Sequence, residues 1–275
     1  MADRAPPLPV LGLVADAFTT VSANLPALQR LGRGPFVVAL VLGLAFGAMQ
    51  PFPWAPMAGL AMGVGYAWFS FGVFRLVLLG PDRAVLPAAP DRGVDGPLIR
   101  RSNLGTFMLR ALGLAVLMAL GIGAVMMVVV YPLAVLPMAP AEQQAMLTRP
   151  GLFIAGSLIL STVLAALPVG IPVVRLATVL PMTAIERDTT LAAAWALSRG
   201  HGLRLTLALL VLAAPFLLGY AALEATLAML AGMAGAEGPG FLAHLMALAL
   251  ATAMGMTLTA LLSVAMARAW TVMAP

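Results

Sequence analysis

Few side chains in this 275-residue chain are suited to chemistry, and they do not form a compact group. Glu186, Asp188 and His201 lie on one connecting segment, and general acid–base catalysis uses these residue types when they converge within hydrogen-bond distance. With Arg199 nearby, a lipid-modifying enzyme at the membrane interface is one open interpretation. The sequence has no compact Ser, His and Asp group and no phosphate-cradling loop. We therefore assign no catalytic residue.

Glu224 is the strong candidate for a charged group within the hydrocarbon, where carboxylates are costly and usually face a partner or water. It lies about twenty residues beyond Arg204, which predicts a position near the outer end of an apolar helix, within reach of lipid headgroups. A buried pair or an ion site is the alternative. That alternative would favour a transporter of small molecules or lipids.

The residue types give no support to metal or cofactor chemistry. The chain has no cysteine, which excludes a disulfide, a thiolate nucleophile and a sulfur-ligated metal. His201 and His244 lie far apart and lack the spacing of zinc ligands. We therefore predict neither a metal ion nor a cofactor.

The composition places the whole chain in a lipid environment. Hydrophobic residues make up 62% of the sequence and charged residues 9%, and the mean hydropathy is +1.04. This leaves too little polar surface to cover a soluble domain. At roughly 20 residues per crossing, the chain has room for about six helices. We predict a single integral membrane domain over residues 1–275, with an interfacial helix and its lead-in over 1–34 and a six-helix bundle over 35–275.

The predicted fold class is all-α, a polytopic membrane helix bundle of about six transmembrane helices arranged as three hairpins. Pro168 and Pro172 predict a kink near the end of the fourth helix. The GxxxG spacings that begin at Gly43 and Gly59 would let the first two helices approach closely. The predicted crossings are residues 36–52, 57–79, 107–131, 152–174, 205–229 and 241–267.

Two further segments have the pattern of helices that lie at a membrane surface. Over residues 10–28, apolar residues recur at three- and four-residue steps, which predicts an N-terminal amphipathic interfacial helix that Pro26 bends or ends. The second segment lies near residues 176–200 and is either surface-lying or re-entrant. Asp188 or Thr189 is its predicted N-terminal cap.

All fifteen basic residues are arginine, and the predicted threading places fourteen of them on one side, with only Arg149 opposite. Basic residues of short loops stay cytoplasmic, so we predict a bacterial inner-membrane protein with both termini in the cytoplasm. Fourteen arginines and seven acidic residues give that face a net charge of +7, which attracts anionic phospholipid. The arginines form no aromatic-interleaved basic patch, so nucleic acid is not a predicted partner.

Six residues are the candidates for a functional role or for lipid contact. Arg75 and Arg175 each mark the end of a predicted inward-going helix, and Trp195 and Arg199 lie on the second surface segment. The full set is Arg75, Arg175, Glu186, Trp195, Arg199 and Glu224.

Two stretches resemble a known group of membrane proteins. One runs from Arg175 to Pro215 and carries Leu180-Pro181, Glu186 and Ala194-Trp195-Ala196-Leu197-Ser198-Arg199-Gly200, and the other runs from Trp68 to Pro81 and carries Arg75 and Leu76-Val77-Leu78-Leu79-Gly80. They cover about a quarter of the chain and resemble bacterial six-helix membrane proteins that are similar to the membrane region of glycerophosphodiester phosphodiesterases. The resemblance implies a six-helix inner-membrane domain with interfacial helices. It does not extend to the phosphodiesterase's catalytic domain, so that activity is not carried over.

Taken together, these patterns predict a non-catalytic, multi-pass protein that acts as an accessory, scaffold or membrane-organising component. Its predicted partners are phospholipid, anionic on the cytoplasmic face, and a membrane-protein complex. A transporter of small molecules or lipids is the first alternative, and an interfacial lipid-modifying enzyme is the second.

Overall fold

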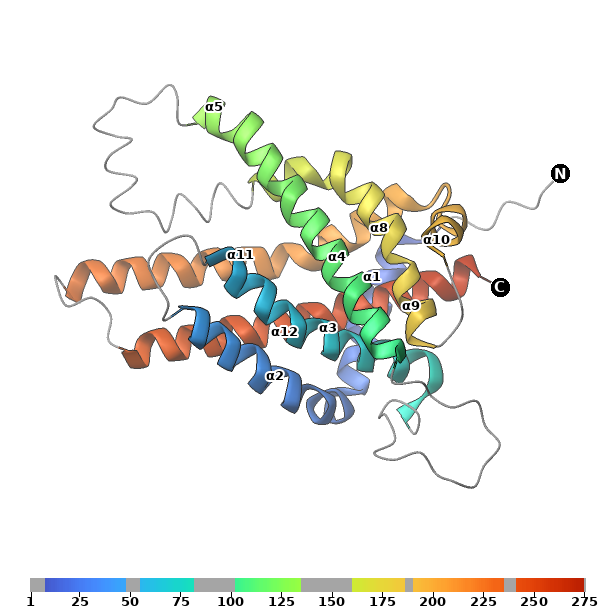
Figure 1. The fold of residues 1–275 in the computed structure, drawn as a ribbon, viewed down its shortest axis with the longest axis horizontal. Coiled ribbons are helices and arrows are strands. Elements are labelled where there is room, and N and C mark those ends of the chain that lie inside the picture. The colour runs from blue at the N-terminus through green and yellow to red at the C-terminus, as the bar shows by residue number, and fades with distance from the viewer. Residues whose placement is uncertain are drawn as a thin grey trace.

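The chain folds as an all-α helix bundle, which confirms the predicted fold class (Figure 1). Within the described residues, six helical stretches are long and apolar enough to cross a membrane, one of them the interrupted stretch Leu160–Ala184, so the protein is multi-pass by helix length and composition. The computed structural model describes residues 8–47, 55–81, 102–134, 160–185, 190–234 and 241–274.

Ten α-helices are bounded within the described residues. They are α1 (Val10–Ala23), α2 (Leu25–Gly47), α3 (Ala55–Leu79), α4 (Ser102–Val125), α5 (Tyr131–Ala134), α8 (Ile171–Ala177), α9 (Val179–Ala184), α10 (Leu191–Leu197), α11 (Gly202–Ala234) and α12 (Phe241–Met273). Two π-helical turns, Met126–Val130 and Ala166–Gly170, precede α5 and α8.

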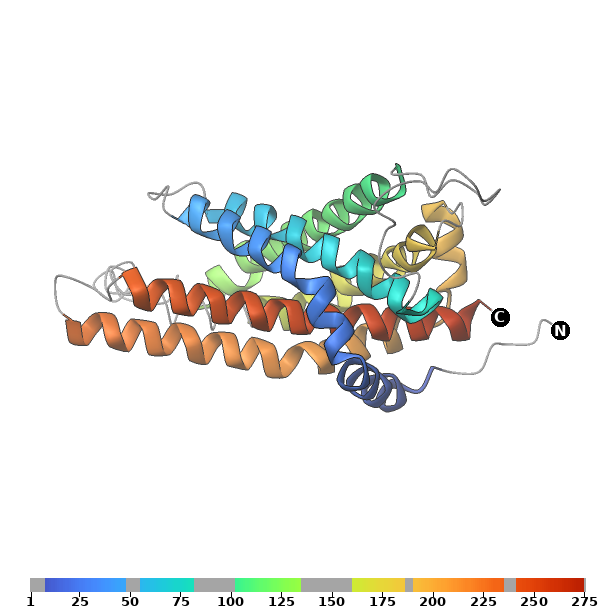
Figure 2. The same cartoon turned by 90° about the horizontal axis from the view of Figure 1, so that it is seen from below.

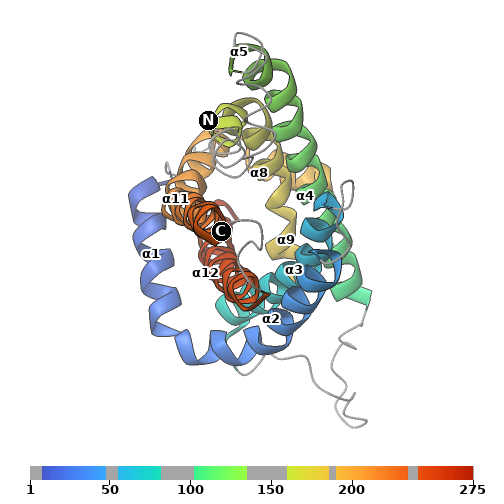
Figure 3. The ribbon, with the colours of Figure 1, turned by 90° about the vertical axis from the view of Figure 1, so that its left-hand side faces the viewer.

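The two longest helices, α11 and α12, run side by side along the long axis of the molecule (Figures 1 and 2). Helix α1 lies crosswise to this pair and contacts both of its members, so that Figure 2 shows α1 nearly end-on and Figure 3 shows it beside them. Its residues Leu13 and Ala17 are buried against the bundle, whereas Leu11 and Phe18 are exposed. The spacing of the buried pair is that of one helix face.

The first long helix begins earlier than the predicted crossing. A turn at Asn24 ends α1, and α2 starts at Leu25 with Pro26 in its first turn, where a proline costs no helical hydrogen bond. The helix then continues through Pro35, so its predicted start at Phe36 was wrong. Proline is tolerated inside such a helix because neighbouring helices help to satisfy the freed backbone groups, and Pro35 is buried against α3.

The fourth crossing is interrupted where prolines predicted a kink. Pro168 lies within the π-helical turn, and α8 begins directly after this turn with Pro172 near its start. The following segment is helical in two short pieces, α9 and α10. The side chain of Thr190 accepts a hydrogen bond from the Ala193 N–H at 3.1 Å, so the cap of α10 is Thr190 and not Asp188 or Thr189.

Two apolar clusters hold the bundle together. The first joins α1, α3, α4, α8, α9, α11 and α12. Within it, the ring of Phe107 meets Phe71 and Phe74 edge-on at centroid distances of 5.2 Å and 5.9 Å. Such edge-on pairs add to the stabilisation that comes from burial. The second cluster joins α1, α2, α3, α11 and α12, with Ala39 and Leu261 among its buried members. The two clusters together contain residues of every long helix, α2, α3, α4, α11 and α12.

Helices α2 and α3 approach closely at a glycine outside the predicted GxxxG spacings. A methyl group at Gly65 would lie 2.6 Å from the Pro35 carbonyl oxygen and 2.9 Å from the Ala39 Cβ. Gly43 does face α3, through Met62, but Gly63 faces Leu112 of α4. A small residue therefore does bring α2 and α3 together, but it is Gly65. Of the predicted spacings, Gly63 is not at that contact, and Gly47 and Gly59 lie outside the residues whose side chains are described.

Candidate functional site

The arginines in the described part of the chain all lie at one end of the bundle, here called the arginine end. They lie in the N-terminal parts of α2, α4 and α11, in the C-terminal parts of α3 and α12, and in the α8–α10 segment, which comprises residues 171–200. In Figure 1 this is the end that carries the C-terminus. The arginine end brings together four of the six candidate residues, Arg75, Arg175, Trp195 and Arg199.

Arg175 connects α8 to α10. Its guanidinium carbon lies 3.6 Å from the centroid of the Trp195 ring, and its Nη2 donates a hydrogen bond of 2.7 Å to the Trp195 carbonyl oxygen. A longer bond of 3.4 Å runs from its Nε to the Ser198 hydroxyl. Gly202 makes room for the stem of this arginine, because a methyl group there would lie 2.9 Å from its Cγ and Cδ. One side chain thus fixes the position of α10 on α8.

Arg75 and Arg110 bind the opposite side of the same segment, at the C-terminal end of α9. Arg75, which is only 3% exposed, donates from Nη1 to the Ala184 carbonyl oxygen at 3.3 Å. Arg110 donates from Nη1 to the Thr183 hydroxyl at 2.6 Å. A helix C-terminus carries a partial negative charge, so cations are stabilising there. The two arginines therefore hold the end of α9 against α3 and α4.

The hydroxyls of one threonine and one serine of the segment also help to hold α10 in place. The Thr178 hydroxyl is 3.2 Å from the Ala194 carbonyl oxygen of α10 and 2.8 Å from the Arg175 carbonyl oxygen, and the Ser198 hydroxyl donates locally to the Ala194 carbonyl oxygen at 2.9 Å. Thr178, Ala194 and Ser198 are all fully buried. Buried hydroxyls with partners make the segment a fixed part of the fold, since an unpaired one would cost stability.

The α8–α10 segment presents Trp195 and Arg199 outward. Trp195 is 39% exposed despite its stack on Arg175, and Arg199 is exposed just beyond the end of α10. A guanidinium remains charged at any physiological pH and gives up no proton, so these groups suit binding and orientation, not acid–base chemistry. An exposed aromatic ring beside a cation is an arrangement suited to headgroups or to a protein surface.

Two candidate residues cannot be placed in a site. Glu186 lies outside the described residues, as does Asp188. Glu224 belongs to the distal half of α11, far along the helix from the arginine end, but its side chain is outside the described set.

The Nδ1 atom of His201 is buried and has no hydrogen-bond partner within the described residues. The described part of the chain also contains no group of three or more His, Asp or Glu side chains that could hold a metal ion.

Sequence reasoning missed Arg110 as a site residue, together with its partner Thr183. The available signal was that Arg110 lies inside an apolar helix, where an arginine needs a partner. Its partner is distant in sequence and polar but uncharged, and no spacing rule connects the two. The same holds for Arg75 and the Ala184 carbonyl, because any residue type supplies a carbonyl.

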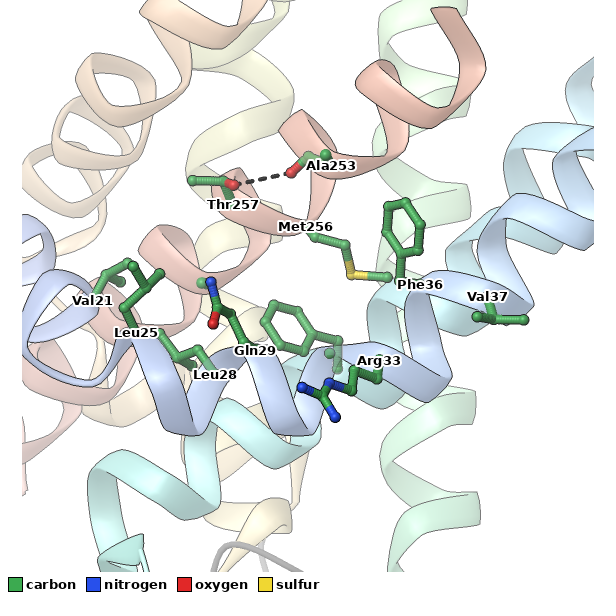
Figure 4. A pocket seen from close by; sticks show the side chains of 13 residues that line it. Val21, Leu25, Leu28, Gln29, Arg33, Phe36, Val37, Ala253, Met256 and Thr257 are labelled. Atoms are coloured by element: carbon green, nitrogen blue, oxygen red, sulfur yellow. Dashed lines mark hydrogen bonds between the residues drawn. The ribbon is translucent and has the colours of Figure 1, made fainter. Parts of the chain in front are cut away.

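A second feature at this end of the bundle is an apolar groove with a cavity volume of about 610 Å³. Its walls come from α2 between Leu25 and Val37 and from α12 between Ala253 and Ala260, with Val21 of α1 and Phe69 of α3 also lining it. In Figure 4 Gln29 points from α2 toward α12, whereas the Arg33 side chain runs along α2. No part of the sequence analysis predicted this groove.

Comparison with known proteins identifies no relative of this chain. No family model matches the chain, and neither a curated protein nor a solved structure does. The similarity to the membrane region of glycerophosphodiester phosphodiesterases is therefore still a prediction from the two motif-bearing stretches.

Proposed function

We propose that this protein is a non-catalytic, multi-pass component of the bacterial inner membrane that acts as an accessory or membrane-organising protein. The proposal rests on the hydrogen bonds of three arginines. Arg75, Arg110 and Arg175 donate to the α9–α10 backbone and to the Thr183 and Ser198 hydroxyls. These three arginines hold a fixed platform, and Trp195 and Arg199, which are exposed on it, are the proposed partner contacts. A rigid aromatic and cationic surface favours binding.

The proposed orientation has both termini in the cytoplasm. It is supported by the arginines gathered at the arginine end, because short cytoplasmic segments carry an excess of basic residues. In this orientation α10 and α1 lie toward the cytoplasmic leaflet, where anionic lipid attracts arginine with about 1 kcal/mol per residue near the surface. The proposed partners are therefore anionic phospholipid and a membrane protein that contacts α10.

Single-cysteine labelling tests the orientation, since the natural chain has no cysteine. We expect an impermeant maleimide added outside intact spheroplasts to label Met138→Cys and Gly235→Cys. Ala193→Cys, at an exposed position of α10, should react only after the membrane is opened. Labelling of Ala193→Cys from outside, with protection of the other two, would reverse the proposed topology.

The partner role is tested by gentle extraction of the native complex into polymer-bounded lipid discs, followed by mass spectrometry of the retained proteins. We expect one partner at a fixed ratio to the wild-type protein. Trp195→Ala with Arg199→Gln should reduce its retention more than about tenfold, because buried Trp and Arg contacts commonly contribute about 2 kcal/mol or more.

Leu250→Ala is the matched control for that experiment, because Leu250 is exposed on α12 in its distal half. The control should retain the partner as the wild-type protein does. A protein that emerges alone from every extraction, or a partner retained equally by the double variant, contradicts the accessory role.

A further inference from the structure

The groove between α2 and α12 is open and amphiphilic. Arg33 is the one charged side chain in its lining, and it lies one helical turn from Gln29 on α2. Both side chains are exposed, and Arg33 forms no ion pair with any described residue. Apart from these two, the lining is apolar except for Thr257, whose hydroxyl already donates to the Ala253 carbonyl oxygen at 2.9 Å. The groove thus has one cationic edge and apolar walls.

The polar and apolar parts of the groove are separated along α2. The Arg33 side chain extends back along α2 toward the corner with α1 (Figure 4). Long helical side chains lean toward the helix N-terminus in this way, and arginine keeps its charged head near the interface while its stem covers apolar surface. Phe36 and Val37 lie farther along α2 toward the middle of the bundle, opposite Ala253 and Met256 of α12. The charge therefore lies toward the interfacial end.

The close packing behind the groove gives it a firm floor. A methyl group at Gly32 would lie 3.3 Å from the Phe69 ring, so α2 rests directly on this buried aromatic side chain of α3. Phe69 and Met256 belong to the second apolar cluster, and both line the groove. Its volume of about 610 Å³ lies within the range of about 300–1,000 Å³ that is usual for small-ligand sites.

We propose that the groove binds one anionic glycerophospholipid of the cytoplasmic leaflet, with its phosphate at Arg33 and Gln29 and one acyl chain along Phe36, Val37 and Ala253. Charge complementarity commits the site to this occupant. A guanidinium matches a phosphate in geometry and charge. If an apolar helix of another protein occupied the groove instead, it would supply no negative charge to Arg33. The site is separate from α10, so it can be tested independently of the proposed partner surface.

Native mass spectrometry of the detergent-purified full-length protein tests the site, with dioleoyl phosphatidylglycerol and dioleoyl phosphatidylcholine as the added probes. We expect one phosphatidylglycerol to bind more tightly than phosphatidylcholine. Arg33→Gln should lower the affinity for phosphatidylglycerol about fivefold, equivalent to about 1 kcal/mol, and remove the preference. Arg30→Gln is the matched control, because Arg30 is exposed on the same helix but does not line the groove.

A steric variant tests the acyl-chain position. Thr257→Trp fills the groove from an exposed position of α12 and should abolish binding of both lipids, whereas Leu250→Trp, also exposed on α12, should not. Helical circular dichroism establishes that each variant is folded. Ala253→Trp serves as a second groove-filling variant if Thr257→Trp does not fold.

Three outcomes would overturn the proposal. One is equal lipid affinity in the wild-type, Arg33→Gln and groove-filling proteins. Another is a dimer mass that Thr257→Trp converts to a monomer, which would assign the groove to a second copy. The third is a co-purified protein lost from Thr257→Trp but retained by the Trp195→Ala and Arg199→Gln variant, which would assign the groove to a partner helix. Failure of the partner experiment on α10 would leave the lipid result unaffected.

Discussion

Replacing Arg75 with methionine is expected to lower the midpoint of thermal unfolding in detergent by about 4–8 °C. Methionine keeps the unbranched stem but removes the donor to the Ala184 carbonyl oxygen and the cation 5.6 Å from the Phe71 ring centroid. A buried acceptor left without a partner costs about 1–3 kcal/mol. For a chain of this size, about 2–4 °C corresponds to each 1 kcal/mol.

The measurement follows intrinsic tryptophan fluorescence during heating, with Arg30→Met as the matched control. Arg30 is exposed on α2, so its loss should shift the midpoint by less than about 1 °C. Because Arg75 fixes the end of α9, proteolysis near residues 185–190 should also become faster in Arg75→Met. An unchanged midpoint and an unchanged proteolysis rate would show that Arg75 does not hold α9.

Replacing Gly65 with alanine should destabilise the bundle still more. The new methyl group would meet the Pro35 carbonyl oxygen at 2.6 Å, and a backbone atom cannot rotate away as the end of a side chain can. Helices α2 and α3 must separate, which weakens the burial of Ala39 and Phe69 between them. Overpacking of this kind commonly costs about 1–3 kcal/mol, and a backbone clash lies at the upper end.

Gly113→Ala is the control that separates this clash from the general effect of adding a methyl group to a helix. Gly113 of α4 is exposed, and a methyl group there would meet no atom within 4 Å. Alanine is favoured over glycine inside helices by about 0.5–1 kcal/mol, so Gly113→Ala should unfold at the wild-type temperature or slightly above it. Equal midpoints for Gly65→Ala and Gly113→Ala would contradict the close α2–α3 contact.

Some ends of the long helices were predicted from the local sequence, at positions where a glycine or a change from polar to apolar residues marks the boundary. The predicted start of the sixth crossing at Phe241 agrees with the start of α12, and the predicted end of the second at residue 79 agrees with the end of α3 at Leu79. A left-handed glycine, Gly80 with φ +89°, follows α3 directly. The start of α2 was missed because the prediction began at the long apolar run after Arg33, whereas the helix begins at Leu25 and continues through Pro35, which packs against α3.

The arginine end shows why side-chain partners were harder to predict. Arg75 and Arg175 were candidates because each marks the end of a predicted inward-going helix. Their partners are the carbonyl oxygens of Ala184 and Trp195, which any residue type could supply. The sequence therefore marked these positions without indicating which groups the two arginines contact.

The sequence by itself indicated a membrane protein of the all-α class, because hydropathy and helix length depend on residues close together in the chain. The same local information located the N-terminal helix α1 and the break at Pro168. Only the tertiary structure decided the contact at Gly65, the three arginines that hold α9–α10, and the groove beside Arg33. Each of these depends on helix surfaces that are distant in sequence, and their separation is set by packing, which no local pattern encodes.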